Sequence, residues 1–273
     1  MIHKGRLLFL GTGASMGTPV IGCSCPVCRS KNHHNNRLRS SIYCTIADQK
    51  ILVDCGPDFK QQALHHKITQ VDGLILTHSH NDHIAGIDDL RIICLRSGKP
   101  IPCLLSRETA KDIKQRFNYI FEEKETYAGL ITRFGMQEFE RDRGEVVFQG
   151  IRIGYCSYWQ LGMKVNGLRF GSLAYVSDIK DYPDSIFEDL KGADTLILSA
   201  LRFEETKMHF SLDDAIAFSK KVEAKKTWLM HVSHDLDHEK GNAYLPENIK
   251  IAYDGLQLEF EADIVNEMRN HVI

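Results

Sequence analysis

Residues 74–90, LILTHSHNDHIAGIDDL, constrain what this chain can fold into more than any other stretch of its 273 residues. A short apolar run precedes the polar centre and helically spaced apolar residues follow it, so the sequence predicts a buried strand, a turn and a helix. The turn holds His78, His80, Asp82 and His83. Because residues two apart in extended backbone face the same way, the first two imidazoles can reach one ion. Imidazole with carboxylate suits zinc, manganese or iron, so this density predicts a metal site rather than a solvated polar turn.

Four side chains cannot fill the shells of two metals, so further ligands are expected at the ends of other strands. Asp178 follows the apolar run LAYVS, and His231 follows KTWLM. Either residue alone is more often a capping aspartate or a hydrogen-bonded core histidine. Their matching positions at two predicted strand ends make both of them candidate ligands.

The order of predicted elements indicates a single domain spanning residues 1–273. Strands come first and then mix with helices, twice over, so we expect two packed sheets with helices outside them. The net charge of −2 gives no broad basic field, which disfavours nucleic acid as a partner. The N-terminus has an apolar core of only four residues, too short for a secretion signal, and no stretch approaches a membrane span. The expected location is therefore the cytoplasm, without a membrane partner.

Three of the eight cysteines, Cys23, Cys25 and Cys28, lie in the N-terminal loop at residues 22–29. In a cytosolic chain such a cluster favours metal or redox chemistry over disulfides. A closed structural zinc site needs four ligands. A redox pair at Cys25 and Cys28 has a suitable spacing but leaves Cys23 unused. The other five cysteines stand in apolar runs and are expected to be buried.

Six motifs occur in the order seen in hydrolases of the metallo-β-lactamase fold: GTGASMGTPVIGCSCPVC, LVDCGPD, THSHNDH, AYVSD, HFSLDDA and MHVSHD. The set resembles, more narrowly, the phosphoribosyl cyclic phosphate phosphodiesterases of phosphonate metabolism and their uncharacterised bacterial relatives. The resemblance covers nearly the whole chain. It implies a mixed α/β fold, the four-layer αββα sandwich, with a dinuclear metal site between the sheets, and it makes a homodimer plausible.

The resemblance also implies roles for individual residues. The implied ligands of the two metals are His78 and His80 for the first, Asp82, His83 and His231 for the second, and Asp178 as the bridge. Asp54 is implied to orient one of these ligands, and Asp82 and His209 to serve catalysis. His209 precedes a predicted helix whose N-terminus favours phosphate. The residues implied for a structural zinc at the N-terminal loop are Cys23, Cys25, Cys28 and His234.

One position departs from the family pattern. The family's first metal normally has a third histidine, before the strand that carries the bridging aspartate. This chain has no histidine between His83 and His209, and the family position falls on or near Gln160. A glutamine oxygen can bind a metal but is a weaker donor than imidazole for zinc-like ions. The first site is therefore expected to hold a harder ion such as manganese, to bind weakly, or to stay empty.

Four functions compete. A pair of zinc or manganese ions can stabilise in-line attack on phosphorus, which favours a phosphodiesterase acting on small, including cyclic, phosphate esters. A nuclease acting on RNA or DNA is the first alternative, disfavoured by the charge and by the lack of a counterpart to the long arm of transfer-RNA-processing enzymes. Thioester or lactam hydrolysis relies on the missing histidine. A catalytically impaired metal-binding protein is supported by Gln160 and opposed by the other site residues, all of which are retained.

Overall fold

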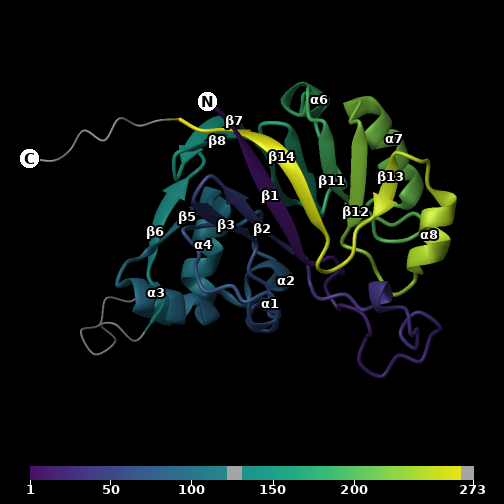
Figure 1. Cartoon of the computed structure of the whole chain (residues 1–273), viewed down its shortest axis with the longest axis horizontal. Coiled ribbons are helices and arrows are strands. Elements are labelled where there is room, and N and C mark those ends of the chain that lie inside the picture. The colour runs from purple at the N-terminus through teal and green to yellow at the C-terminus, as the bar shows by residue number, and fades with distance from the viewer. Residues whose placement is uncertain (122–130, 266–273) are drawn as a thin grey trace, which may run out of the picture.

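The computed structural model describes residues 1–121 and 131–265, which form two seven-stranded sheets (Figure 1). The strand order is β14–β1–β2–β3–β4–β5–β6 in the first sheet and β13–β12–β11–β10–β9–β8–β7 in the second. The strands of the first sheet are β1 (Ile2–Gly11), β2 (Ser41–Ile46), β3 (Gln49–Val53), β4 (Gly73–Ile75), β5 (Ile101–Leu105), β6 (Phe134–Glu138) and β14 (Gln257–Asp263). Those of the second are β7 (Arg143–Phe148), β8 (Ile151–Gln160), β9 (Met163–Phe170), β10 (Leu173–Val176), β11 (Thr195–Ser199), β12 (Lys226–Met230) and β13 (Ile249–Ile251).

Helices cover the outer face of each sheet, so the layers follow the order helix, sheet, sheet, helix (Figure 1). The helices on the first sheet are α1 (Phe59–His65), α2 (Asn81–Ile84), α3 (Arg91–Ser97), α4 (Arg107–Arg116) and α5 (Asn118–Phe121). Those on the second are α6 (Ile186–Asp189), α7 (Leu212–Val222) and α8 (His238–Tyr244), and two short 3-10 helices span His33–Asn35 and Ile87–Leu90. The expected four-layer αββα sandwich is therefore confirmed.

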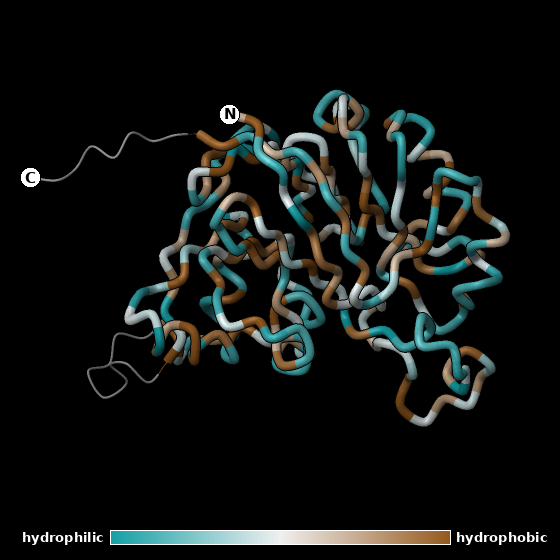
Figure 2. Tube along the Cα trace, viewed as in Figure 1, coloured by the Kyte–Doolittle hydropathy of each residue, from teal (hydrophilic) through white to brown (hydrophobic). Residues whose placement is uncertain are grey.

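Three apolar cores fill the spaces between these layers. The central core joins the inner faces of the two sheets and contains Phe9 and Tyr175. A second lies between the first sheet and its helices, around Leu52, and a third between the second sheet and α7, around Phe218. Apolar residues follow the strands through the interior, whereas polar residues gather on helices and loops (Figure 2). The five scattered cysteines are buried, as predicted: Cys44, Cys55, Cys94, Cys103 and Cys156.

The pairing of the strands decides where functional side chains can meet. Strands β3 to β6 pair in parallel in the first sheet, and β10 to β13 do so in the second. Parallel neighbours bring their carboxyl ends to one edge of a sheet. Side chains that follow β3, β4, β10 and β12 can therefore converge at one end of the sandwich.

Helices begin and end where the sequence provides strong capping residues. Ser211 caps α7, since its Oγ accepts from the Asp214 N–H at 3.2 Å and its own N–H donates to the Asp214 carboxylate at 3.0 Å. Helix α3 ends at Gly98, whose left-handed backbone (φ 69°) closes the last turn. The helix predicted over residues 107–124 divides at Phe117 into α4 and α5, and its residues 122–124 lie outside the described residues.

Several predicted connections are wrong. The apolar pattern of residues 249–260 predicts a final strand or a hairpin, but this segment changes sheets, because β13 belongs to the second sheet and β14 to the first. Gly135 and Gly144 predict turns, but both residues lie inside strands, β6 and β7. Gly150 does turn the chain, with a left-handed φ of 75°. Local sequence preference could not separate these cases, because the choice of partner strand is made by the whole sheet.

Candidate metal centre

The residues that follow three of the strands share an unusual backbone conformation, with a positive φ angle. Asp54 follows β3, Asp178 lies just beyond β10, and His231 follows β12, with φ angles of 61°, 53° and 59°. A left-handed backbone at a residue other than glycine costs of order 1–3 kcal/mol and persists only where its surroundings hold it. The three residues therefore point their side chains to one place at an energetic cost, which is typical of a functional site.

A close approach of two backbones brings α2 against the end of β3. A Cβ atom on Gly56 would lie 2.1 Å from the carbonyl oxygen of Asp82, so only glycine fits there. The Cys55 N–H donates to the His83 carbonyl at 2.7 Å, which ties the same two segments together. This packing places Asp82 and His83 beside Asp54, although the two motifs lie far apart in the sequence.

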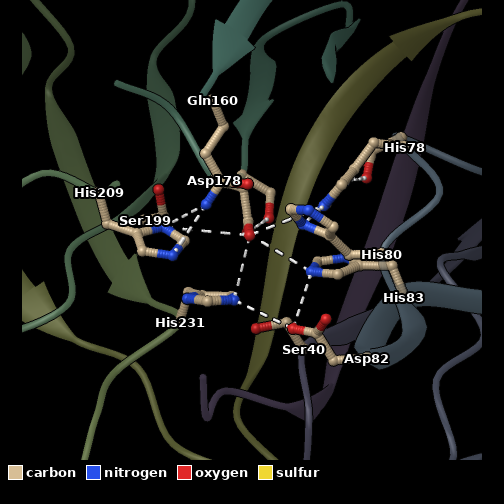
Figure 3. Close-up of polar contacts among 12 residues, drawn as sticks. Ser40, His78, His80, Asp82, His83, Gln160, Asp178, Ser199, His209 and His231 are labelled. Carbon is tan, nitrogen blue, oxygen red and sulfur yellow. Dashed lines mark hydrogen bonds and ion pairs between the residues drawn. The ribbon is translucent and has the colours of Figure 1, made fainter. Parts of the chain in front are cut away.

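The first cluster consists of His78, His80 and Asp178 (Figure 3). His78 Nε2 lies 2.9 Å from His80 Nδ1 and 3.7 Å from Asp178 Oδ2. His78 is fully buried, and its Nδ1 lies 3.0 Å from the Thr77 hydroxyl, so its other nitrogen is left facing the carboxylate. One nitrogen from each imidazole and one carboxylate oxygen lie within 4.8 Å of one another, close enough to share a single ion.

The second cluster consists of Asp82, His83, Asp178 and His231, all buried. Asp82 Oδ2 lies 3.4 Å from the Nε2 atoms of both His83 and His231. Asp178 faces the same two imidazoles, with Oδ1 3.5 Å from His83 Nε2 and Oδ2 3.2 Å from His231 Nε2. Asp178 therefore belongs to both clusters, and the other five implied metal ligands surround its carboxylate (Figure 3).

Asp54 orients His83, one member of the second cluster, through a hydrogen bond to its ring. Its Oδ1 accepts from the Thr77 N–H at 2.9 Å, and its Oδ2 accepts from the Thr77 hydroxyl at 2.9 Å. The same Oδ2 lies 2.7 Å from His83 Nδ1, an arrangement that places the proton of the neutral ring on Nδ1 and the lone pair on Nε2. His83 Nε2 is buried and has no hydrogen-bond partner among the described residues. Such a lone pair, beside two carboxylates, fits a cation.

Thr77 was not identified from the sequence. Its hydroxyl and N–H hold Asp54, and its Oγ1 also contacts His78 Nδ1, so one residue orients members of both clusters. Its position directly before the first motif histidine was the only available signal. A threonine there is equally well explained as a β-branched strand residue, and only the fold brings Asp54 beside it.

The electrostatics hold both carboxylates and His78 in the protonation states that a metal requires. Burial opposes ionisation of Asp178, but His231 and His83 outweigh it and hold the pKa of this carboxyl well below its usual range. Burial likewise opposes ionisation of Asp82, and the same two imidazoles lower its pKa. Burial, assisted by His83, lowers the pKa of His78 well below its usual value, which keeps its lone pair available. The carboxylates raise the pKa of His83 against its burial, so a proton there and a bound cation compete for the same negative field.

Gln160 and His209 lie next to the first cluster and contact one another. Gln160 ends β8 and is 1% exposed, and its Nε2 lies 2.9 Å from His209 Nε2 and 3.2 Å from His209 Nδ1. His209 Nδ1 lies 4.0 Å from Asp178 Oδ2, and its ring stacks on that of His231. Burial lowers the pKa of His209 to about 4, so this ring is neutral near pH 7. Thr206 fixes its backbone by accepting the His209 N–H at 2.8 Å.

The N-terminal loop forms a separate cluster of Cys23, Cys25, Cys28 and His234. The three sulfur atoms lie 3.3, 3.6 and 3.6 Å from His234 Nδ1. The Cys28 N–H donates to the Cys25 sulfur, and this bond is the main reason that the pKa of Cys25 falls to about 6. Three sulfurs and one imidazole form a donor set that suits a closed zinc site. The structure thus brings together all four residues predicted for zinc.

The segment that leads into the loop is tied to the metal clusters through the backbone of Val232, the residue after His231. The Ala14 N–H donates to the Val232 carbonyl at 3.0 Å, and the Val232 N–H donates to the Thr12 carbonyl at 3.0 Å. Arg37, 2% exposed, donates to the Thr12 hydroxyl at 2.7 Å and to the Ala252 carbonyl at 2.6 Å. The polar surroundings of His238 in the sequence predict a surface loop, but the side chain is buried and contacts the Arg37 guanidinium at 3.0 Å.

Comparison with known proteins identifies the family. Residues 49–232 match the family described as the beta-lactamase superfamily domain, and the chain belongs to this superfamily. It is similar to the crystal structure of a diphosphatase from the PhnP family, with 37% identity, a TM-score of 0.88, and coverage of 96% of this chain and 99% of that one. The resemblance stated from the motifs is therefore confirmed. The superfamily fold implies binding of divalent metal, and together with the buried clusters it supports a metal-dependent hydrolase.

Two other proteins resemble this chain over part of their length or in fold alone. A protein of Porphyromonas gingivalis named octanoyltransferase is 34% identical over 259 residues, covering 92% of this chain and 51% of that protein. The chain thus spans about half the length of that relative. The short form of human tRNase Z has a TM-score of 0.63 at 17% identity, with 93% of this chain and 98% of that one covered, which shows a shared fold alone. Among the described residues, no helix combines the length and apolar character needed to cross a membrane.

Proposed function

We propose that this chain is a metal-dependent phosphodiesterase that hydrolyses small phosphate esters, including cyclic ones. The observation that carries the proposal is the position of Asp178, whose carboxylate is shared by two clusters of ligands, all buried except the half-buried His80. A shared carboxylate suits two divalent ions, which we propose to be zinc or manganese, and the loop cluster suits one structural zinc. When bound, a pair of such ions neutralises charge on a phosphoryl group and acidifies a water.

The chain's own residues supply orientation and proton handling. His78, His80, Asp82, His83 and His231 are the proposed ligands, with Asp178 as the bridge. Asp54 holds His83 in the tautomer that presents its lone pair. His209 stays neutral at physiological pH because burial lowers its pKa, so its N–H is available to donate a hydrogen bond to an oxygen that leaves phosphorus.

The substrate class follows from charge and from the relatives. A net charge of −2 disfavours a long polyanion such as RNA, so the nuclease function remains the less supported alternative. A second candidate is hydrolysis of a diphosphate linkage, favoured by the 37% identity to a PhnP-family diphosphatase. Both reactions attack phosphorus and differ only in the leaving group. The name octanoyltransferase describes a protein about twice as long, of which this chain covers 51%.

The proposal is tested by hydrolysis assays on the purified chain after loading with manganese or zinc. A cyclic ribose phosphodiester, a linear aryl phosphodiester, a dinucleoside diphosphate and a transfer-RNA precursor form the panel. We expect turnover of at least one small diester or diphosphate, lost on chelation and restored by metal. Cleavage of the RNA alone would replace the proposal with the nuclease function. A chain that carries both metals in the buried clusters and cleaves nothing would favour the non-catalytic alternative.

A further inference from the structure

The amide nitrogen of Gln160 has a hydrogen-bond partner, whereas its amide oxygen has none among the described residues. Its Nε2 lies 2.9 and 3.2 Å from the two ring nitrogens of His209. Its Oε1 is buried and has no hydrogen-bond partner within residues 1–121 and 131–265. Figure 3 shows the side chain reaching from the end of β8 toward Asp178, on the side of the cluster where His209 lies. A buried carbonyl oxygen without a partner is rare, and each case calls for an explanation.

The first cluster offers fewer donors than the second. It offers two imidazoles and one carboxylate, whereas the second offers two imidazoles and two carboxylates. A divalent ion held by His78, His80 and Asp178 is one protein ligand short of a four-coordinate shell. An amide oxygen is an accepted ligand for hard divalent ions, and manganese accepts it more readily than zinc does.

We infer that Gln160 couples the first metal site to His209, a role that rests on the metal centre proposed above. Its oxygen completes the ligand set of His78, His80 and Asp178, and its NH₂ group holds His209 in place. One residue thereby replaces a third histidine and positions the histidine that faces the substrate. Gln160 is a metal ligand through its oxygen and a positioning residue through its nitrogen.

The two roles are linked because an amide has only two orientations in this slot. With a cation in the first cluster, the oxygen must face the cation, since the NH₂ group would be repelled. The NH₂ group then faces the nearer ring nitrogen of His209, Nε2 at 2.9 Å, which must offer it a lone pair. Without the cation, the amide can turn over and accept a proton from a His209 N–H instead. Filling the first site therefore selects the tautomer of His209.

Metal affinity tests the first role. We expect Gln160→Leu to lower the affinity of the weaker manganese site at least about tenfold. The protein carries zinc in the loop site, and electron paramagnetic resonance measures the free Mn²⁺ during the titration. Gln62→Leu is the matched control, because Gln62 is also 1% exposed, has an unpartnered Oε1 and donates to the Arg39 carbonyl. Gln160→Glu should bind manganese more tightly than the wild type. Unchanged affinity in Gln160→Leu would overturn the inference.

The tautomer of His209 tests the second role without any activity assay. We expect the ¹⁵N shifts of its ring to change between metal-free and zinc-loaded protein in the wild type, and to stay constant in Gln160→Leu. Gln160→Glu, which cannot donate from its carboxylate, should hold His209 with an N–H toward position 160 in both states. The same zinc-dependent change in wild type and Gln160→Leu would contradict the coupling. These outcomes are independent of which phosphate ester, if any, is cleaved.

Discussion

Replacing Asp178 with alanine is expected to remove both active-site metals and to lower phosphoester turnover by roughly 10³-fold or more. The carboxylate contributes one oxygen to each cluster, and Ser177 holds it in place by donating to Oδ1 at 2.7 Å. Its loss leaves the first cluster with two imidazoles and the proposed Gln160 oxygen, a set without any negative charge that holds a divalent ion only weakly. Metal content and turnover should fall together, while the zinc of the loop should stay bound.

The matched control for this variant is Asp184→Ala. Asp184 is an exposed aspartate on the connection that follows Asp178, and its removal should leave both quantities unchanged. Circular dichroism of the two variants separates loss of metal from loss of fold. An Asp178→Ala protein that is folded and still carries two active-site metals would show that the carboxylate does not bridge them.

Cys28→Ser is expected to release the loop zinc and to lower the free energy of unfolding by several kcal/mol. Zinc binding to such a site contributes directly to folding, with apparent values of about 10–16 kcal/mol in isolated zinc-finger peptides, and a larger domain retains its other contacts. The segment that leads into the loop carries Thr12 and Ala14, whose backbone hydrogen bonds hold Val232, the residue after His231. We therefore expect a lower unfolding temperature together with weaker binding of the second active-site metal. Zinc content, thermal unfolding and metal titration of one preparation measure all three effects.

Ser24→Ala provides the control for the zinc prediction. Ser24 is exposed between two of the cysteines, and nothing in the cluster depends on its hydroxyl. Its unfolding temperature should match that of the wild type. A Cys28→Ser protein with unchanged stability and an unchanged second metal site would show that the four loop residues do not form a structural zinc site.

The sequence predicts the local parts of this molecule well, because they depend on residues close together. His78 and His80 are two apart beyond a strand, and Ser211 with Asp214 forms a capping box. Asp178 and His231 could be proposed because each follows an apolar run, and the resemblance joined them to one centre. The buried strands follow from apolar runs, and two packed sheets with helices outside them follow from the order of strands and helices along the chain.

The remaining features depend on contacts between distant segments, which local patterns do not encode. The left-handed turns at Asp54, Asp178 and His231 are imposed by the sandwich and contradict the ordinary preference of these residues. The role of Thr77 requires β3 and β4 to lie side by side. The contact between Gln160 and His209 joins the end of β8 to the loop before α7, and a missing histidine in the sequence indicated only that a ligand had changed.

Metal content per chain tests the two-metal centre most directly. The protein is purified without added metal, assayed by mass spectrometry, and assayed again after dialysis against manganese or zinc. We predict three metals per chain after loading, of which one zinc resists mild chelation and two exchange. A single tightly held zinc with no further uptake would contradict the dinuclear centre, and with it the proposed phosphodiesterase.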